Sequence, residues 1–138
     1  MYVDENLQVS DAQALTATAL STSSVDLGVA GRDPGPGKQI YAIITIDTSA
    51  ATADAAKTVT FSVVTDSTAD LATSATTVLA TAALTGAVLT AGRAPIVIPV
   101  PLGIVDRYIG VYYTLSATFT SFTVSAMFGF DYQSNLEG

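Results

Sequence analysis

The alternation that decides the fold lies in residues 107–131, RYIGVYYTLSATFTSFTVSAMFGFD. In the first half of this segment, the odd positions from 109 to 117 are apolar, and the even positions carry Tyr, Gly, Thr and Ser. In the second half, the even positions from 122 to 130 are apolar, and the odd positions are mostly small or polar. Side chains that alternate with a period of two indicate a strand with one buried face. We therefore predict two strands, joined as a hairpin through Phe119 and Thr120.

Similar patterns predict further strands upstream. Residues 57–66 place Val59, Phe61 and Val63 on one face, and residues 39–47 are apolar on both faces, which is typical of a more central strand. Shorter strands are expected over residues 76–82, 87–90 and 95–100. The last contains proline, so it lies at a sheet edge or ends in a bulge. One helical turn is allowed over residues 67–71. Seven or eight short strands with regularly spaced turns indicate an all-β fold: a single jelly-roll-like antiparallel sandwich or barrel.

The N-terminal segment differs from the rest of the chain in composition. Before Gly28, Thr, Ser and Ala dominate, and large apolar residues are few. We interpret residues 1–25 as an extended arm that packs along the domain or a neighbour rather than in the core, and residues 26–138 as the β-sandwich domain. Removal of residues 1 to about 20 is then expected to leave the β-domain folded.

The composition excludes several classes of function. The 138 residues contain no Cys, no His and no Trp, which removes thiol and imidazole catalysis and Cys/His metal sites. The net charge of -7, with only 5 Lys and Arg, disfavours nucleic acid and anionic membrane surfaces. The uncharged runs 71–92 and 108–130 contain too many polar and small residues for a membrane helix. We expect no enzyme activity, no cofactor, no nucleic acid and no membrane partner.

Three weaker chemical signals do not outweigh simpler interpretations of the same residues. Asp66 and Asp70, with Asp47 or Asp54, could contribute oxygen ligands to a calcium ion, but Asp side chains in turns explain them more simply. Glu occurs only at positions 5 and 137, so a glycosidase pair would need two Asp residues, and we predict none. Residues 31–38, GRDPGPGK, resemble a phosphate-binding loop but have the wrong spacing and two prolines, which indicates a surface loop.

Tyrosines give the strongest sign of a binding surface. Tyr108 and Tyr112 share one face of the strand predicted over residues 107–118, with Gly110 between them. Exposed tyrosines bury a large area at low entropic cost and are favoured at protein interfaces. The same residues could stack on sugars or make internal contacts within the domain, so three interpretations stay open.

A series of segments resembles the capsid cement, or decoration, proteins of tailed phages, of the type described for a Bordetella phage. The matching segments are SDAQA (10–14), STSSVDLG (21–28), DPGPG (33–37), TVTF (58–61), TDS (65–67) and RYIGVYY (107–113). The resemblance implies a jelly-roll domain that forms dimers or trimers on the outside of the head and ties neighbouring major capsid subunits together. It implies no catalytic residues.

The expected role is therefore a structural virion protein, made in the host bacterial cytoplasm and placed on the exterior of the capsid. Its expected partners are the major capsid protein and further copies of itself. The arm could also pair with a neighbour's sheet. The alternative is a carbohydrate-binding or other surface-recognition β-domain. The candidate interface residues are Leu15, Leu20, Arg32, Lys38, Arg107, Tyr108 and Tyr112.

Overall fold

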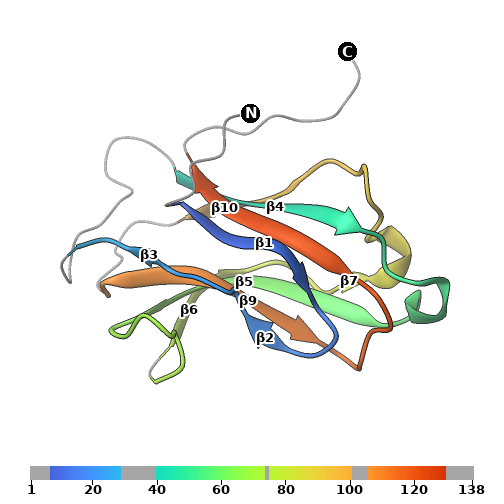
Figure 1. Cartoon of the computed structure of the whole chain (residues 1–138), viewed down its shortest axis with the longest axis horizontal. Coiled ribbons are helices and arrows are strands. Elements are labelled where there is room, and N and C mark those ends of the chain that lie inside the picture. Colours follow the sequence, from blue (N-terminus) through green and yellow to red (C-terminus); the bar gives the residue numbers. More distant parts are fainter. Residues whose placement is uncertain (1–6, 29–39, 74, 101–105, 130–138) are drawn as a thin grey trace, which may run out of the picture.

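The computed structural model describes residues 7–28, 40–73, 75–100 and 106–129, which form strands and two 3₁₀ turns (Figure 1). The strands are β1 (Gln8–Ala14), β2 (Ala19–Leu20), β3 (Val25–Asp26), β4 (Ile40–Thr48), β5 (Thr58–Asp66), β6 (Thr76–Ala80), β7 (Leu84–Thr85), β8 (Ile96–Val100), β9 (Tyr108–Leu115) and β10 (Thr123–Gly129). The 3₁₀ turns are η1 (Thr52–Asp54) and η2 (Gly86–Val88). Among these described residues, no helix has the length and apolar character to cross a membrane. The loop predicted over residues 31–38 lies outside them.

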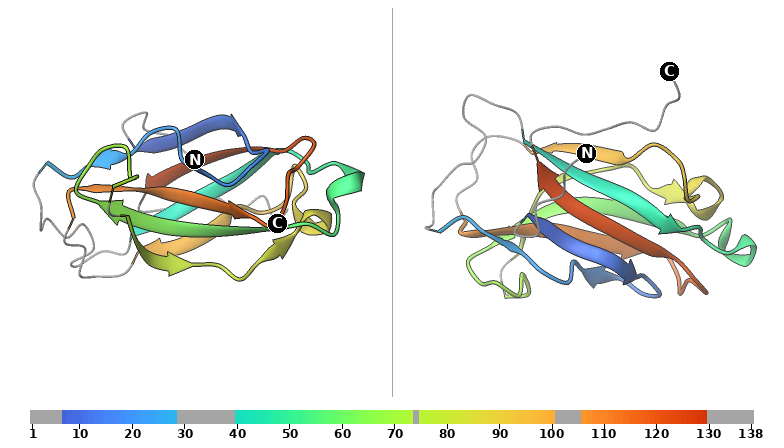
Figure 2. Two further views of the ribbon diagram at one scale, coloured as in Figure 1. Left: turned by 90° about the horizontal axis from the view of Figure 1, so that it is seen from below. Right: turned by 45° about the horizontal axis from the view of Figure 1, so that its top comes forward.

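The strands form two antiparallel sheets that pack face to face (Figure 2). The four-stranded sheet has the order β1-β10-β4-β8, and the second sheet has the order β2-β9-β5-β6, with β3 also on β9 and β7 also on β5. Strands from the first half of the chain pair with strands from the second half in nested order: β1 with β10, β2 and β3 with β9, and β4 with β8. The innermost pair is β5 with β6 and β7. This rolled-up arrangement is a jelly roll and confirms the predicted fold class.

The core lies between the sheets and follows the alternation in the sequence. The four-stranded sheet contributes mainly even-numbered residues, such as Ile44 and Val124, and the second sheet contributes odd-numbered residues, such as Phe61 and Tyr113. The rings of Phe61 and Tyr113 meet edge to face, with centroids 5.8 Å apart. The predicted inner positions of three strands, β5, β9 and β10, are therefore correct.

The connection between β9 and β10 differs from the prediction. The two strands belong to different sheets, so the predicted hairpin is wrong. The chain instead crosses the end of the sandwich, where the buried rings of Phe119 and Phe122 lie 5.7 Å apart. Alternation identifies which face of a strand is buried, but it does not identify the strand's neighbour.

The described part of the N-terminal segment belongs to the sandwich, which corrects the arm interpretation. β1 pairs along β10, and β2 and β3 pair with β9. Val9, Leu15 and Val25 are buried core residues, with exposed fractions of 1%, 0% and 9%. The segment does pack along the domain, but as a part of both sheets. Its removal would uncover the core, so the expectation that the β-domain folds without residues 1 to about 20 does not fit this structure.

Smaller predictions had mixed outcomes. β8 lies at a sheet edge and β4 lies inside the four-stranded sheet, both as predicted. The strand expected over residues 87–90 is wrong, because this region starts with η2. Residues 67–71 form a turn, closed by a hydrogen bond from Leu71 N–H to the Thr68 carbonyl, rather than a helix.

Candidate interaction surface

The outward face of β9 carries the two tyrosines proposed as interface residues. Tyr108 and Tyr112 are both half-buried there, with the buried Gly110 between them. A Cβ atom at Gly110 would lie 2.3 Å from Leu71 Cδ1 and 3.0 Å from Ser21 Oγ. Leu71 therefore fills the space above Gly110, between the positions of the two tyrosines. This arrangement interrupts the flat aromatic surface that stacking on a sugar would need.

Leu71 was not predicted from the sequence to contact this face. Its side chain is 2% exposed and its φ angle is 57°, in the left-handed region. This region costs a residue other than glycine about 1 kcal/mol or more, so the surrounding contacts must stabilise the loop. One signal was present in the sequence: a glycine inside a strand marks a place where another group approaches closely, and Gly110 is such a glycine.

Two aspartates hold the loop that carries Leu71. Asp66 Oδ1 accepts a hydrogen bond from Thr68 N–H at 3.3 Å, and its Oδ2 accepts one from Thr73 N–H at 3.1 Å. Asp70 Oδ1 accepts from the Thr68 hydroxyl at 2.7 Å and from Ala72 N–H at 3.1 Å. The Thr68 hydroxyl and the Ala72 amide lower the pKa of Asp70. These bonds are typical of Asp-stabilised turns, the simpler of the two interpretations considered for these residues.

The described residues include no group of three acidic side chains that could hold a metal ion. Asp54 bonds to other parts of the chain. It accepts from Lys57 Nζ at 2.6 Å and from Thr120 N–H at 2.8 Å, and Lys57 is the main cause of its lowered pKa. Asp54 thus ties η1 to the link between β9 and β10.

Arg107 lies beside Tyr108 and is bound within the chain. Its Nε and Nη2 donate to the two carboxylate oxygens of Asp26, at 2.7 and 2.8 Å. The guanidinium carbon lies 5.1 Å from the centre of the Tyr108 ring. The hydrogen bonds from Arg107, and in second place the one from the Gly28 amide, lower the pKa of Asp26 to about 2. The pair holds β3 against β9 at the surface, and it neutralises the cation proposed as an interface residue.

The two leucines proposed as interface residues occupy different environments. Leu15 is fully buried, and its N–H donates to the Phe122 carbonyl at 2.8 Å, so it is a core residue and not part of the exposed surface. Leu20 is half-buried in β2, where it pairs with Tyr112. Leu20, Tyr108 and Tyr112 therefore border one face of the same sheet, while Leu15 does not.

Polar contacts fix β1 against β2 and the core. The Ser10 hydroxyl lies 2.8 Å from the Tyr113 hydroxyl and donates to Gln13 Oε1 at 2.7 Å. Gln13 Nε2 donates to the Leu20 carbonyl at 2.8 Å. Burial raises the pKa of Tyr113 well above its ordinary value, so this phenol stays protonated. The network explains how a segment rich in small polar residues is held in the sandwich.

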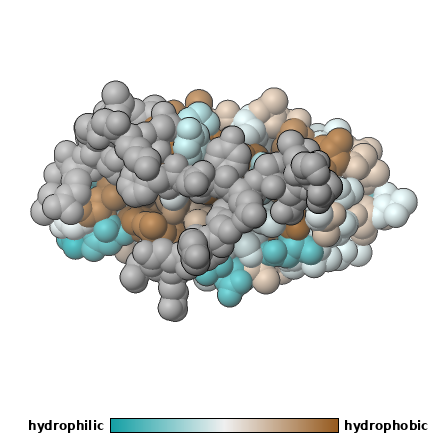
Figure 3. All heavy atoms as spheres, turned by 90° about the horizontal axis from the view of Figure 1, so that it is seen from above, coloured by the Kyte–Doolittle hydropathy of each residue, from teal (hydrophilic) through white to brown (hydrophobic). Residues whose placement is uncertain are grey.

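The cations in the described ranges are all engaged within the chain. Arg107 bonds to Asp26, Lys57 to Asp54, and Arg93 Nη1 donates to the Val88 carbonyl at 2.8 Å. The proposed interface residues Arg32 and Lys38 lie outside the described residues. Figure 3 shows hydrophilic and hydrophobic side chains next to one another on the face seen from above. The net charge of -7 makes the chain as a whole acidic.

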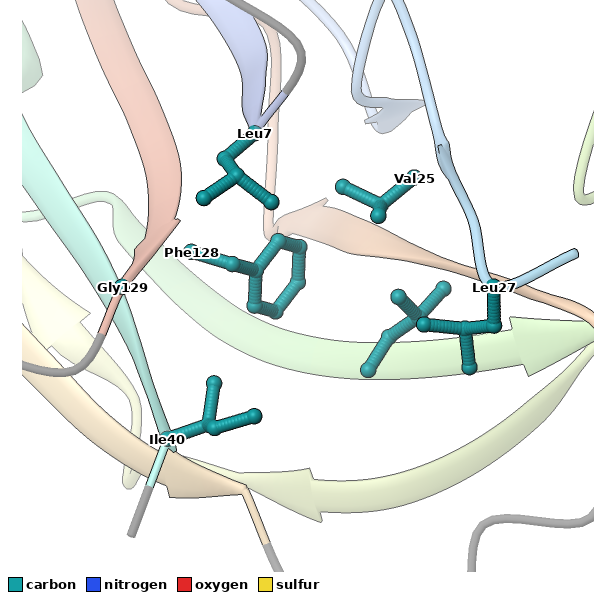
Figure 4. A pocket seen from close by; sticks show the side chains of 7 residues that line it. Leu7, Val25, Leu27, Ile40, Phe128 and Gly129 are labelled. Carbon is teal, nitrogen blue, oxygen red and sulfur yellow. The ribbon is translucent and has the colours of Figure 1, made fainter. Parts of the chain in front are cut away.

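An apolar cavity of about 70 Å³ lies between the sheets at one end of the sandwich. Figure 4 shows the side chains that line it, which come from β3, β4, β9 and β10 and from Leu7 and Leu27, two residues outside the strands. Its lining residues are Leu7, Val25, Leu27, Ile40, Ile109, Phe128 and Gly129. Sites for small molecules usually measure about 300–1,000 Å³ and include a few polar groups. This cavity is therefore a packing gap rather than a cofactor site.

A larger hollow of about 420 Å³ lies beside β1 and residues 22–24. It is open and mainly polar, and it is lined by Gln8, Val9, Ser10, Asp11, Thr22, Ser23 and Ser24. Several of its polar groups bond within the chain: Ser10 as described above, Ser23 N–H to the Val9 carbonyl, and the Ser24 hydroxyl to the Ala69 carbonyl. The hollow offers one carboxylate and no aromatic ring, which supports neither acid-base catalysis nor sugar stacking.

Comparisons with known proteins identify the family. A comparison with curated proteins gave no match. The model of the Bbp16 family matches residues 9–128, which run from the first buried residue of β1 to the last buried residue of β10. The match thus covers both sheets of the jelly roll. The chain belongs to the Bbp16 family, a family of Bordetella phage proteins.

Proposed function

We propose that this protein is a capsid cement protein, a structural component of a phage particle that binds the outer surface of the head and ties neighbouring major capsid subunits together. The observation that carries the proposal is the match to a phage protein family over the whole sandwich. The resemblance of several segments to cement proteins supports the more specific role. Some of these segments lie in strands of the sandwich. Residues 107–113, for example, include most of β9.

The surface chemistry fits binding to a protein shell. Charged residues make up 12% of the chain, and acidic side chains outnumber basic ones by 12 to 5. This acidic surplus would be complementary to a basic patch on the capsid. Exposed ion pairs are screened by salt, so such binding would weaken as ionic strength rises.

The proposal needs no chemistry beyond binding. The candidate partners are the major capsid protein and further copies of the chain, without nucleic acid, membrane, cofactor or catalysis. The carbohydrate-binding alternative depended on Tyr108 and Tyr112 as a stacking surface. The position of Leu71 between them favours the structural and protein-interface interpretations of these tyrosines.

Co-sedimentation with phage heads tests the proposal. Heads that lack the protein are mixed with increasing amounts of it, pelleted, and analysed for bound protein. We expect saturable binding at low salt that weakens at high salt, and little binding to heads that are already decorated. An absence of saturable binding to bare heads at low salt, or equal binding to bare and decorated heads, would contradict it.

A further inference from the structure

The outer strand β6 offers backbone hydrogen-bonding groups to another chain. It lies at one end of the second sheet and pairs with β5 on one side (Figure 1). Four of its five residues are exposed, and Val78, the fifth, is half-buried against the core. An exposed outer strand presents unpaired N–H and C=O groups that can pair with a further strand.

The other outer strands carry features that discourage such pairing. The pairing of β1 with β10 has two register shifts, and β1 contains the exposed Asp11 and a residue, Ala12, with a φ angle of 45°. β8 contains Pro99, which is exposed and has no N–H. β2 and β3 are 2 residues long each. Charges, proline, bulges and short length are the usual means by which proteins protect sheet edges.

β6 has one of these protections and lacks the others. Its sequence, TTVLA, contains no charge and no proline, although its pairing with β5 has one register shift. Leu79 of β6 is 38% exposed, and it is one of the two large apolar side chains that are exposed among the described residues. The other, Val88, lies in η2 beside the opposite end of β5, since Gly86 N–H donates to the Lys57 carbonyl.

Charge identifies the partner that this edge suits. Residues 71–92 contain no charged side chain, whereas the chain as a whole carries a net charge of -7. Two copies that each carry this net charge repel each other, and the repulsion is weakest where an uncharged segment meets an uncharged segment. A second copy therefore fits this edge better than it fits the remaining surface.

We propose that β6 pairs with β6 of a second copy in antiparallel orientation, so that the two second sheets join into one continuous sheet across a two-fold axis. An interface of this kind is self-complementary, because the same strand serves both copies. Backbone hydrogen bonds supply the pairing, and Leu79 of each copy is covered at the contact. This inference deepens the proposed function, since it assigns the surface through which the cement protein contacts itself.

Two matched substitutions test the pairing in solution. Leu79→Glu places a charge on the proposed contact, and Val88→Glu adds the same charge to the other exposed apolar side chain. Analytical ultracentrifugation over a range of concentrations measures the dimer dissociation constant. We expect a dimer for the unmodified chain, an increase in the dissociation constant of at least about tenfold for Leu79→Glu, and little change for Val88→Glu.

A second variant and an independent measurement keep the test decisive. Thr77→Glu changes another exposed β6 residue and is expected to weaken the dimer as Leu79→Glu does, while circular dichroism verifies that each variant is folded. Amide hydrogen exchange in β6 should slow as protein concentration rises. A monomer at all concentrations, or equal effects of the Leu79 and Val88 substitutions, overturns the inference. Since no heads are present, failure here is distinct from failure to bind the shell.

Discussion

Replacement of Leu15 by Ala measures how firmly the N-terminal segment belongs to the sandwich. Leu15 is fully buried, whereas Leu20, five positions later, is half-buried in β2. The change from Leu to Ala removes three carbon atoms, worth about 0.8 kcal/mol each in transfer free energy, and it leaves a cavity. We therefore expect Leu15→Ala to lower the free energy of unfolding by about 3 kcal/mol, and Leu20→Ala by about 1 kcal/mol or less.

Urea and thermal unfolding provide the measurement. The chain has 6 Tyr and no Trp, so tyrosine emission or circular dichroism reports the transition. For a domain of this size, a loss of about 3 kcal/mol corresponds to a fall of roughly 10 °C in the melting temperature. If Leu15→Ala costs no more than Leu20→Ala, then residues 1–25 behave as an arm and our assignment of this segment to the core is wrong.

Three further predictions concern the outward face of β9, its surface ion pair and η2. Gly110→Ala should lower the free energy of unfolding by about 1–3 kcal/mol, because the added Cβ meets Leu71. In a double-mutant cycle with Leu71→Ala, the loss in the double variant should be smaller than the sum of the two single losses by at least about 0.5 kcal/mol. Additive losses would contradict this contact. The pKa of Asp26 is lowered from 3.8 to about 2, so its pair with Arg107 contributes stability above about pH 4 that is lost as the pH falls toward 2. The stability difference between the unmodified chain and Asp26→Asn should accordingly close over that interval, and a difference independent of pH would argue against the pair. Gly86→Ala should lower the melting temperature, because its Cβ would lie 2.3 Å from the backbone oxygen of Asp54. An unchanged melting temperature would contradict this close contact between η1 and η2.

The alternation in residues 107–131 was enough to predict two strands and the buried face of each. It could not predict that β9 and β10 lie in different sheets, because a period of two is the same for a hairpin and for a crossing between sheets. The odd-numbered side chains of β9 and the even-numbered side chains of β10 all point into the core, from the two opposite sheets. Strand partners depend on contacts between distant parts of the chain, which a local pattern does not contain.

The N-terminal segment and Leu71 show a second limit of sequence reasoning. Val9 and Leu15 lie among small polar residues, and the low number of large apolar residues in this segment suggested an arm. The hydrogen bonds of Ser10 and Gln13 nevertheless hold the segment in the sandwich. Leu71 lies in a turn without any apolar pattern, and its burial depends on the small size of Gly110 on another strand. A contact of this kind can be recognised only when the positions of both residues in the fold are known.

Cryo-electron microscopy of phage heads, with and without the protein, tests the central claim most directly. Both samples contain the same shell, so the difference between the two maps isolates the protein. We predict additional density on the outer surface that fits the jelly roll and contacts at least two neighbouring major capsid subunits. Density inside the head, density at the tail, or no difference between the maps would contradict the assignment as a capsid cement protein.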